Sequence, residues 1–413
     1  MSAAARWYPR SRVHPRVLLV GLAAQSAGCV PPEFAPYGGD VDLSSSGDES
    51  TSSDSSSSTS SDETTGELPD ELPLPEYDGE PLPDSPVGQW QWVDFPDALC
   101  RDGTSTGIGV RRGSSPNLII IFEGGGACFN AFTCLANPSH YGLVDFLEWG
   151  GAYRGIFDER PDNPVADWTA VYVPYCSGDV HAGDNHGVSI AELNGEQQFA
   201  GYSNVDAFLR RVVPSFGDAP EVLVTGVSAG GFGAGFNYHR IARIFPGRVT
   251  LLDDSGPVMR DPYLAPCLQQ QWRDVWGFDG TLPEACDECF AVDGGGIHHI
   301  VEFIGLRHPN QRFGYISSER DATISIFYSF GRDECAGLGA VYPSGTFLEG
   351  LHDFRDNVLR PLGNAGSYYI PGNEHTFIGG SRFYTTEVDG VPLTDWVAEL
   401  ISGEVSHISP PPG

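Results

Sequence analysis

Apolar positions are distributed unevenly along this chain. Before residue 87 they are sparse apart from a short N-terminal run, whereas beyond it short apolar runs recur. Residues 118–122 read Leu-Ile-Ile-Ile-Phe, an uninterrupted run typical of a strand buried on both faces. Residues 169–175, 221–226 and 248–252 have the same character. The pattern predicts four strands within one buried sheet.

The stretches between these runs indicate how the strands are connected. They are long enough for crossover helices, such as one over residues 204–213. Parallel strands need such crossovers, so we predict an α/β fold with a mostly parallel central sheet flanked by helices. Two further runs, at residues 90–93 and 107–110, are expected to form antiparallel edge strands.

The N-terminus resembles an export signal. Four arginines precede the apolar run at residues 17–24, which is too short to span a membrane. Ser26-Ala27-Gly28-Cys29 then resembles the lipobox of bacterial lipoproteins, although Ser26 stands where leucine is preferred. We expect residues 1–29 to be a signal peptide that ends at a lipidated Cys29, on the outer membrane or surface of a Gram-negative-type cell. The alternative is an ordinary cleaved signal with an incidental Cys29, and a secreted or periplasmic product.

Residues 30–86 have the composition of a tether. Ser, Asp, Glu and later Pro dominate, and few apolar side chains are present, so we expect this segment to be disordered. Its like charges would keep it extended. Residues 87–413 are expected to form one globular, catalytic domain.

The charge of the chain excludes two classes of partner. The sequence has 55 acidic and 23 basic residues, and its formal net charge is −32. Nucleic acids and anionic membrane surfaces would repel such a chain. We therefore expect no nucleic-acid partner and no membrane contact other than the lipid anchor, and we expect a monomer.

The cysteine count favours disulfides. Of nine cysteines, eight remain when Cys29 is set aside, and an even number in an exported chain suggests up to four disulfides. Short loops favour the pairs Cys128–Cys134 and Cys286–Cys289. The second pair also has the CxxC spacing of a zinc site, but a single CxxC in an exported chain favours a disulfide. We therefore predict no metal site.

The predicted strand at residues 221–226 runs directly into Gly226-Val227-Ser228-Ala229-Gly230. This is the G-x-S-x-G pattern of a nucleophile elbow, in which a serine occupies a strained turn between a strand and a helix. Residues 237–244 can continue as that helix. The alternative is a serine in a structural turn. The context of strand and helix favours Ser228 as a nucleophile.

Acyl transfer also requires hydrogen-bond donors for the oxyanion. One should be the backbone N–H of Ala229, the residue after the nucleophile. Residues 123–127, Glu-Gly-Gly-Gly-Ala, follow an earlier strand and could supply the others from Gly125 and Gly126. A phosphate-binding loop is the rival interpretation, but this segment lacks both the Lys-Ser/Thr ending and the G-x-G-x-x-G spacing of such loops.

These segments are part of a wider resemblance. Four ordered motifs, at residues 122–130, 173–180, 226–231 and 254–256, resemble those of the pectin acetylesterase/Notum family. Its members are α/β-hydrolase-like serine carboxylesterases that remove acetyl groups from pectin or a palmitoleoyl group from Wnt proteins. The resemblance implies an α/β-hydrolase-like fold, here with disulfide-bonded loops, and an esterase activity.

The acid and the base of such an enzyme follow the serine in the order Asp, then His. We predict His375 as the base, because an apolar strand precedes its loop and because it matches the family's terminal histidine. Asp321 is the predicted acid, since residues 313–321 read as a strand followed by a loop carboxylate and resemble the family's acid segment. Asp333 has similar surroundings and stays open as the alternative, whereas the resemblance implies a structural role for residues 253–254. The remaining late histidines are His298, His299, His308, His352 and His407.

The predicted chemistry needs no cofactor. His375 would take a proton from Ser228, which attacks an ester carbonyl, while Asp321 orients the imidazole. The resemblance implies an acylated carbohydrate or another ester as substrate. Wnt-deacylating members have aromatic residues where this chain has Gly126 and Ala127, so we expect acetyl groups on a polysaccharide such as pectin. Two alternatives are an inactive surface lipoprotein that binds a glycan or a partner protein, and a lipase with the same triad.

Overall fold

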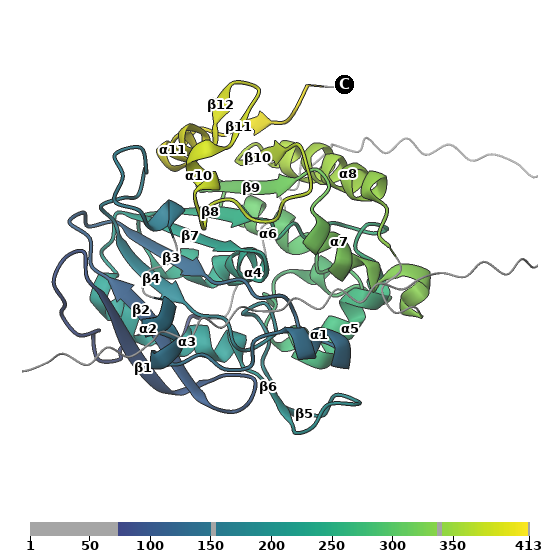
Figure 1. The fold of residues 1–413 in the computed structure, drawn as a ribbon, viewed down its shortest axis with the longest axis horizontal. Helices are drawn as coiled ribbons and strands as arrows, with labels where there is room; N and C mark the ends of the chain where they lie inside the picture. Colours follow the sequence, from purple (N-terminus) through teal and green to yellow (C-terminus); the bar gives the residue numbers. More distant parts are fainter. Residues whose placement is uncertain (1–72, 150–153, 337–340, 412–413) are drawn as a thin grey trace, which may run out of the picture. The chain divides into compact units, whose positions relative to one another are not determined.

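A nine-stranded sheet forms the centre of the described domain. In the computed structural model its strand order is β1-β2-β4-β3-β7-β8-β9-β10-β13 (Figure 1). The pairs β1–β2 and β2–β4 are antiparallel, and the remaining pairs are parallel. The predicted α/β class is confirmed, and the two expected antiparallel strands precede the parallel part, although only β1 lies at the edge because β2 pairs with both β1 and β4.

The structure describes residues 73–149, 154–336 and 341–411, which fall within one compact unit. The expected signal peptide, Cys29 and residues 30–72 of the expected tether lie outside the described residues.

The strands lie close to their predicted positions. β4 ends at Val173, before Pro174, whose missing N–H could not join the sheet. The main sheet consists of β1 (Trp90–Leu99), β2 (Ser105–Arg111), β3 (Leu118–Phe122), β4 (Thr169–Val173), β7 (Glu221–Val227), β8 (Arg248–Asp254), β9 (Arg312–Ser318), β10 (Ala365–Ile370) and β13 (His407–Ile408). Two small ribbons are formed by β5 (Asn185–Val188) with β6 (Gln197–Phe199), and by β11 (Glu387–Val388) with β12 (Val391–Pro392).

Helices connect the parallel strands, as predicted. They are α1 (Ala131–Ala136), α2 (Leu143–Trp149), α3 (Gly201–Phe216), α4 (Ala229–Ile244), α5 (Pro266–Trp276), α6 (His299–Arg307), α7 (Ala322–Ser329), α8 (Ser344–Asp353), α9 (Arg360–Leu362), α10 (Arg382–Thr385) and α11 (Leu393–Ser402). Shorter 3₁₀ and π segments are η1 (Gly155–Phe157), η2 (Phe278–Gly280), η3 (Asp287–Cys289), η4 (Arg332–Cys335) and η5 (Phe354–Leu359).

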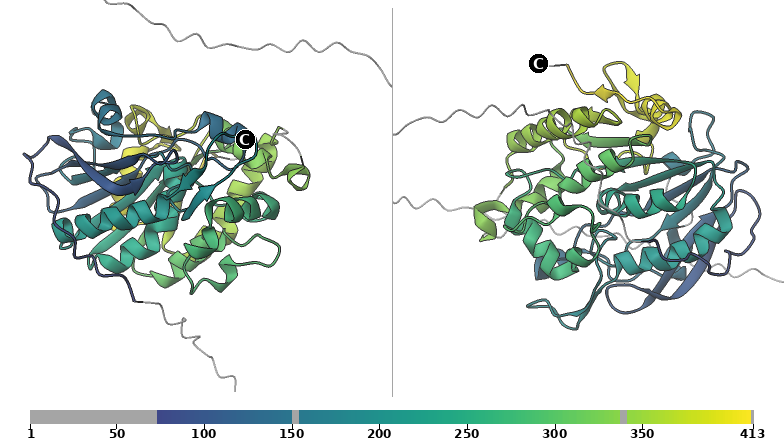
Figure 2. Two further views of the ribbon diagram at one scale, coloured as in Figure 1. Left: turned by 90° about the horizontal axis from the view of Figure 1, so that it is seen from below. Right: turned by 180° about the vertical axis from the view of Figure 1, so that it is seen from behind.

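Both faces of the sheet are covered, which explains the uninterrupted apolar run of β3. Alternate side chains of a strand point to opposite faces. Ile120 belongs to a buried cluster with residues of α3, α4 and α6, whereas Ile121 belongs to a second cluster with residues of α2, α10 and α11. Figure 2 shows helices on both sides of the sheet. The sheet is therefore a rigid, buried platform whose strand ends can position functional groups.

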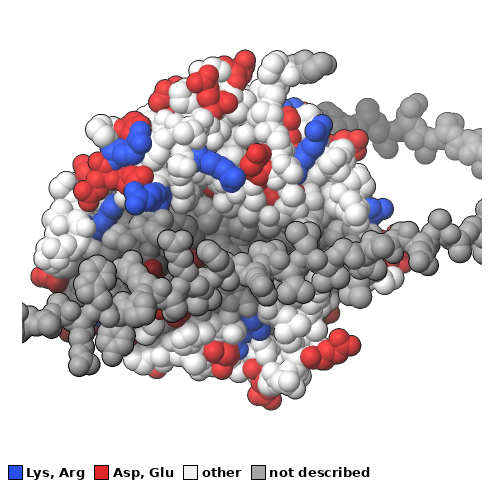
Figure 3. All heavy atoms as spheres, viewed as in Figure 1, with Lys and Arg blue, Asp and Glu red and all other residues white. Residues whose placement is uncertain are grey.

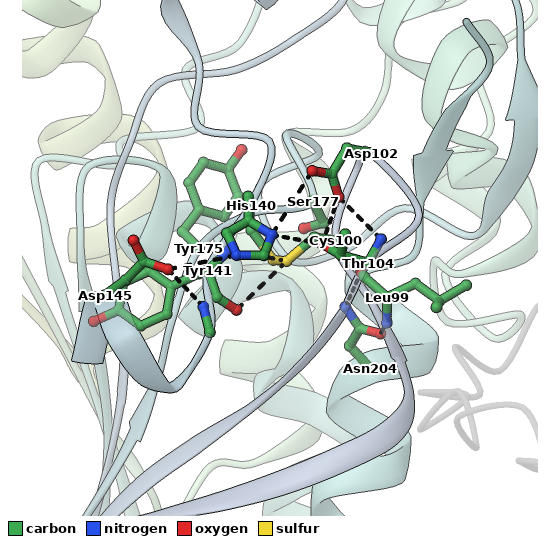
Figure 4. The surroundings of a disulfide bond; sticks show 12 residues. Leu99, Cys100, Asp102, Thr104, His140, Tyr141, Asp145, Tyr175, Ser177 and Asn204 are labelled. Atoms are coloured by element: carbon green, nitrogen blue, oxygen red, sulfur yellow. Dashed lines mark hydrogen bonds and ion pairs between the residues drawn. A yellow bond between two sulfur atoms is a disulfide. The ribbon is translucent and has the colours of Figure 1, made fainter. Parts of the chain in front are cut away.

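Four disulfides join loops around this platform. Both pairs that short loops favoured are present, and the disulfides among the described residues are Cys100–Cys176, Cys128–Cys134, Cys267–Cys335 and Cys286–Cys289. Figure 4 shows the surroundings of the first bond, with the His140 ring between the carboxylates of Asp102 and Asp145. This bond ties the end of β1 to the segment after β4, which carries Tyr175.

Part of the expected tether is packed against the domain. Leu82 is buried, and its N–H donates to Ser215 Oγ of α3 over 2.7 Å. Arg211 Nε, from the same helix, donates to the Glu80 carbonyl over 2.9 Å. This packing was hard to predict, because one leucine among Pro, Asp and Glu carries a weak apolar signal. Packed structure therefore begins before residue 87.

Within the described ranges, no helix is long and apolar enough to cross a bilayer. Figure 3 shows acidic and basic side chains interspersed over the described part of one face.

Candidate active site

Ser228 occupies a strained turn between β7 and α4. Its φ of 58° and ψ of −122° lie in a region that few non-glycine residues adopt. The glycines on either side are required by packing, since a Cβ on Gly226 would lie 2.0 Å from the Gly230 carbonyl oxygen. A Cβ on Gly230 would lie equally close, 2.0 Å, to the carbonyl oxygen of Phe122. This is the strand–turn–helix geometry that the G-x-S-x-G pattern predicted.

Asp321 and His375 come together although 54 positions separate them in the chain. His375 Nδ1 lies 2.7 Å from Asp321 Oδ2, and the aspartate side chain is fully buried. The other carboxylate oxygen, Oδ1, caps α7 by accepting the N–H groups of Thr323 and Ile324, each over 2.9 Å. Because one oxygen holds the helix and the other holds the imidazole, the carboxylate has a fixed orientation.

The second imidazole nitrogen of His375 is available. Nε2 is buried and has no hydrogen-bond partner among the described residues. An imidazole that carries its proton on Nδ1, facing a carboxylate, has a basic lone pair on Nε2. A histidine in this state can accept a proton from a neighbouring hydroxyl.

Asp254, at the end of β8, connects the histidine loop to the serine turn. Its Oδ2 accepts the N–H groups of Phe377 and Ile378, over 2.6 and 2.8 Å. Its backbone carbonyl accepts the N–H of Ser228 over 2.7 Å. Burial raises the pKa of this carboxyl group above its ordinary value. One residue thus holds the loop that follows His375 against the turn that carries the serine.

The competing acids occupy other positions. Asp333 is exposed, with a left-handed φ of 51°, in a short segment at the disulfide of Cys335. Asp253 Oδ1 accepts the N–H of Gly256 over 2.8 Å, and burial raises its pKa well above the ordinary value. Among the hydrogen bonds of the described residues, only Asp321 contributes a carboxylate to the His375 ring.

The other late histidines lie in different surroundings. His299 pairs with Glu302 on its own helix, and His298 stacks on His299. His308 contacts His239 on α4, and His407 contacts the Ser367 hydroxyl on β10.

The glycine loop after β3 lies against the serine. A Cβ on Gly124 would be 3.0 Å from the Ser228 Cβ, so only a glycine permits this approach. Gly126 has a φ of +81°, which also favours glycine. The backbone N–H groups of Gly125, Gly126 and Ala229 donate to no partner among the described residues. Unpaired N–H groups beside a serine are suited to stabilise a developing oxyanion.

Two residues that the sequence did not single out hold this loop in place. His181 Nε2 lies 2.8 Å from the carbonyl oxygen of Glu123, and Asn137 Nδ2 donates to the Gly125 carbonyl over the same 2.8 Å. Burial lowers the pKa of His181 to about 4, so the ring is neutral near pH 7 and donates from Nε2. In the sequence, His181 could have been noticed because it directly follows the motif at residues 173–180.

Asp179, which ends that motif's Ser-Gly-Asp sequence, is structural. It is fully buried, accepts the Ser177 hydroxyl over 2.5 Å and the Gly201 N–H over 2.7 Å. Burial raises its pKa to about 6. The carboxylate thereby fixes the start of α3 against the segment that carries His181.

A groove of about 1150 Å³ flanks the site without containing the serine or the imidazole. It lies beside the acid and the histidine loop, since Arg320, Ala322, Gly372 and Asn373 line it. Aromatic and polar side chains share its walls, among them Phe132, Phe330, Tyr342, Glu192, Gln271 and Asn130.

The described residues contain no cluster of three His, Cys, Asp or Glu side chains that could hold a metal ion.

Comparison with known proteins finds a matching family model and several relatives. Residues 91–291 match the family model described as Pectinacetylesterase. Palmitoleoyl-protein carboxylesterase notum2 of Xenopus laevis is 29% identical over 216 residues, which cover 46% of this chain and 43% of that protein. Inactive palmitoleoyl-protein carboxylesterase notum1b of Danio rerio is 33% identical over 90 residues, which cover 20% of this chain and 65% of that protein.

A similar fold is present in a solved structure, the Wnt deacylase Notum from Drosophila. The TM-score is 0.56 at 20% sequence identity, over 76% of this chain and 94% of that one. At this identity the likeness concerns the fold alone. The chain spans less than half the length of the Xenopus relative, 43%.

Proposed function

We propose, from the premise that this chain carries a pectinacetylesterase domain, that it is a serine carboxylesterase in which Ser228, His375 and Asp321 form the catalytic triad. The observation that carries this proposal is the 2.7 Å contact between His375 Nδ1 and the buried Asp321 carboxylate, with Nε2 left unpaired. Support also comes from the strained Ser228 turn and the unpaired N–H groups beside it.

The mechanism follows from these positions. His375 Nε2 takes the proton of Ser228 Oγ as the oxygen attacks the ester carbonyl, and Asp321 stabilises the imidazolium that results. The N–H groups of Gly125, Gly126 and Ala229 stabilise the tetrahedral oxyanion. The alcohol leaves with the proton from His375. Water, activated by the same histidine, then attacks the acyl-enzyme and releases the acid.

The proposed substrate is a short acyl ester, an acetyl group on a polysaccharide such as pectin. The family match supports an ester substrate and leaves the acyl group open. The groove beside the histidine loop supports a carbohydrate, because it combines aromatic walls with amide and hydroxyl groups.

Hydrolysis of p-nitrophenyl acetate by the wild type and by Ser228→Ala tests the reaction. We expect the alanine variant to lose at least about 10³-fold in kcat. Equal activity of the two proteins would remove Ser228 from the mechanism. Release of acetate from acetylated pectin, against acetylated xylan as the comparison, tests the polysaccharide.

An inactive binding protein is the second candidate, because one relative, from Danio rerio, is named an inactive carboxylesterase. A folded wild type with no activity on any ester, and unreactive with a fluorophosphonate probe, would favour it. A lipase with the same triad would instead prefer long-chain esters at an oil–water interface.

We also propose that the enzyme is exported and anchored through Cys29. The sequence of residues 26–29 supports this. Mass spectrometry of the mature N-terminus should find an acylated cysteine, and an unmodified residue at the mature N-terminus would contradict the anchor. Sedimentation of the enzyme tests the expected monomer.

A further inference from the structure

α7 runs from the acid to the oxyanion side of the site. It begins directly after Asp321, which pairs with His375. Six residues later, about 9 Å along a helix, Phe327 reaches the glycine loop. The helix therefore extends from the acid of the proposed triad to the glycine loop on the opposite side of the site.

The Phe327 ring closes that opposite side. Its tip, Cζ, would lie 3.2 Å from a Cβ on Gly126, and Cε1 would lie 4.0 Å away. The ring thus packs directly against the backbone of a predicted oxyanion donor. Phe327 is half-buried and packs against the core, so its position is held by its neighbours. Other α7 side chains, including Ile326, face the neighbouring groove instead.

The arrangement of the substituents on the reacting carbonyl carbon indicates which part of the substrate meets this ring. The carbonyl carbon bound to Ser228 Oγ carries the oxyanion, the leaving group and the acyl substituent. The oxyanion lies at the N–H groups, and the leaving oxygen must lie near His375 Nε2 to receive its proton. The acyl substituent then points away from His375 Nε2 and from the N–H groups, and Phe327, which packs against the loop that carries two of these groups, is a side chain that it can meet.

We propose that Phe327 is a specificity-determining residue that restricts the acyl group to a short chain such as acetyl. This inference rests on the proposed serine esterase function and adds the side chain that sets acyl length. The ring fills the space that a longer chain would need. The loop at this point is held, because Asn137 Nδ2 donates to the carbonyl of the neighbouring Gly125 over 2.8 Å.

Chain-length profiles test the proposal. The values of kcat/KM for p-nitrophenyl acetate, butyrate and octanoate are measured for the wild type, Phe327→Ala and Phe327→Leu. In a hydrophobic pocket one methylene is worth about 10-fold or more in kcat/KM, so Phe327→Ala should raise the octanoate-to-acetate ratio by about 10- to 100-fold. Phe327→Leu, which retains most of the apolar packing, should raise it by about 3- to 10-fold.

Leu306→Ala is the control. This apolar side chain of α6 is 61% exposed and is not among the residues that line the groove, so its loss should leave the ratio within about twofold of the wild-type value. Thermal melting verifies that each variant is folded. If Phe327→Ala fails to fold, the leucine variant decides.

The outcomes separate the two proposals. A wild type that hydrolyses octanoate as well as acetate, or folded Phe327 variants with an unchanged ratio, would overturn the role of Phe327 and leave the esterase intact. A wild type that hydrolyses no ester in the series would overturn the esterase itself.

Discussion

Asp321 caps α7 and also pairs with His375, and a single substitution should separate these two roles. Asp321→Asn keeps an oxygen that can cap α7, where Oδ1 accepts two N–H groups at 2.9 Å. It replaces the oxygen that faces His375 Nδ1, at 2.7 Å, with an amide that donates. The imidazole must then present a lone pair on Nδ1 and carry its proton on Nε2, which is the wrong tautomer for a base.

The expected loss of activity is large and the loss of stability small. An aspartate that sets the histidine tautomer in a triad is worth about 10⁴-fold in kcat, which is about 5 kcal/mol of activation free energy. The helix cap that asparagine retains is worth about 1 kcal/mol. We therefore expect Asp321→Asn to lose about 10³- to 10⁴-fold in kcat for p-nitrophenyl acetate, with KM nearly unchanged and a melting temperature within a few degrees of the wild type.

Two further variants complete this test. Asp321→Ala should be as inactive as Asp321→Asn and also lose the cap, which lowers the free energy of unfolding by an additional 0.5–2 kcal/mol or so. Asp333→Asn, at an exposed position, should retain full activity. Activity of Asp321→Asn within about tenfold of the wild type, or a larger loss for Asp333→Asn, would refute the assignment of the acid.

Three further predictions concern the groups that hold the site together. His181 has a folded pKa of about 4, below the usual 6.5, so its contribution to stability is complete above pH 6.5 and is lost as the pH falls toward 4. In chemical denaturation the His181→Gln variant, whose amide does not titrate, should lose about 3 kcal/mol of this pH dependence of the free energy of unfolding. An equal dependence on pH in both proteins would contradict this prediction. Gly126→Ala should reduce kcat by about 10²-fold, because the loop must shift from its left-handed conformation. Gly390→Ala, at a glycine with a φ of +77° and open space around it, should be destabilised without losing activity. Asp254→Ala leaves two buried N–H groups unpaired and should lower the free energy of unfolding by about 2–6 kcal/mol in urea titrations. Asp254→Asn, which keeps an acceptor oxygen, should keep most of the stability and activity. Similar losses for both variants would show that the negative charge of the carboxylate, rather than its role as an acceptor, matters.

The parts of the fold that the sequence predicted well are those with a strong local signal. The run at residues 118–122 could be read as a buried strand because both faces of β3 are covered, so every position is apolar. The elbow was predictable because Gly226 and Gly230 are dictated by close backbone contacts, which no other residue type satisfies. Asp321 and His375 followed from their places after strands, and their pairing is a consequence of β9 and β10 being parallel neighbours.

What the sequence could not predict depends on contacts between distant segments. Leu82 has no apolar neighbours in sequence, and its burial arises from α3, more than a hundred residues away. His181 was overlooked because its partner is a backbone carbonyl on another loop, which leaves no pattern in the side chains. Two of the four disulfides, Cys100–Cys176 and Cys267–Cys335, close long loops for which spacing alone offers no preference.

The parallel sheet also explains why one buried aspartate can govern the geometry of the whole site. Parallel strands bring their carboxyl ends to one edge, so β7, β8, β9 and β10 end beside one another. The serine follows β7, the acid follows β9 and the histidine follows β10, whereas β8 lies between them and ends in Asp254. That position lets its carbonyl hold the Ser228 turn while its carboxylate holds the loop after His375. In the proposed mechanism Asp254 takes no part in the proton transfer, but it holds both the serine turn and the histidine loop, which is why its removal should affect kcat as well as stability.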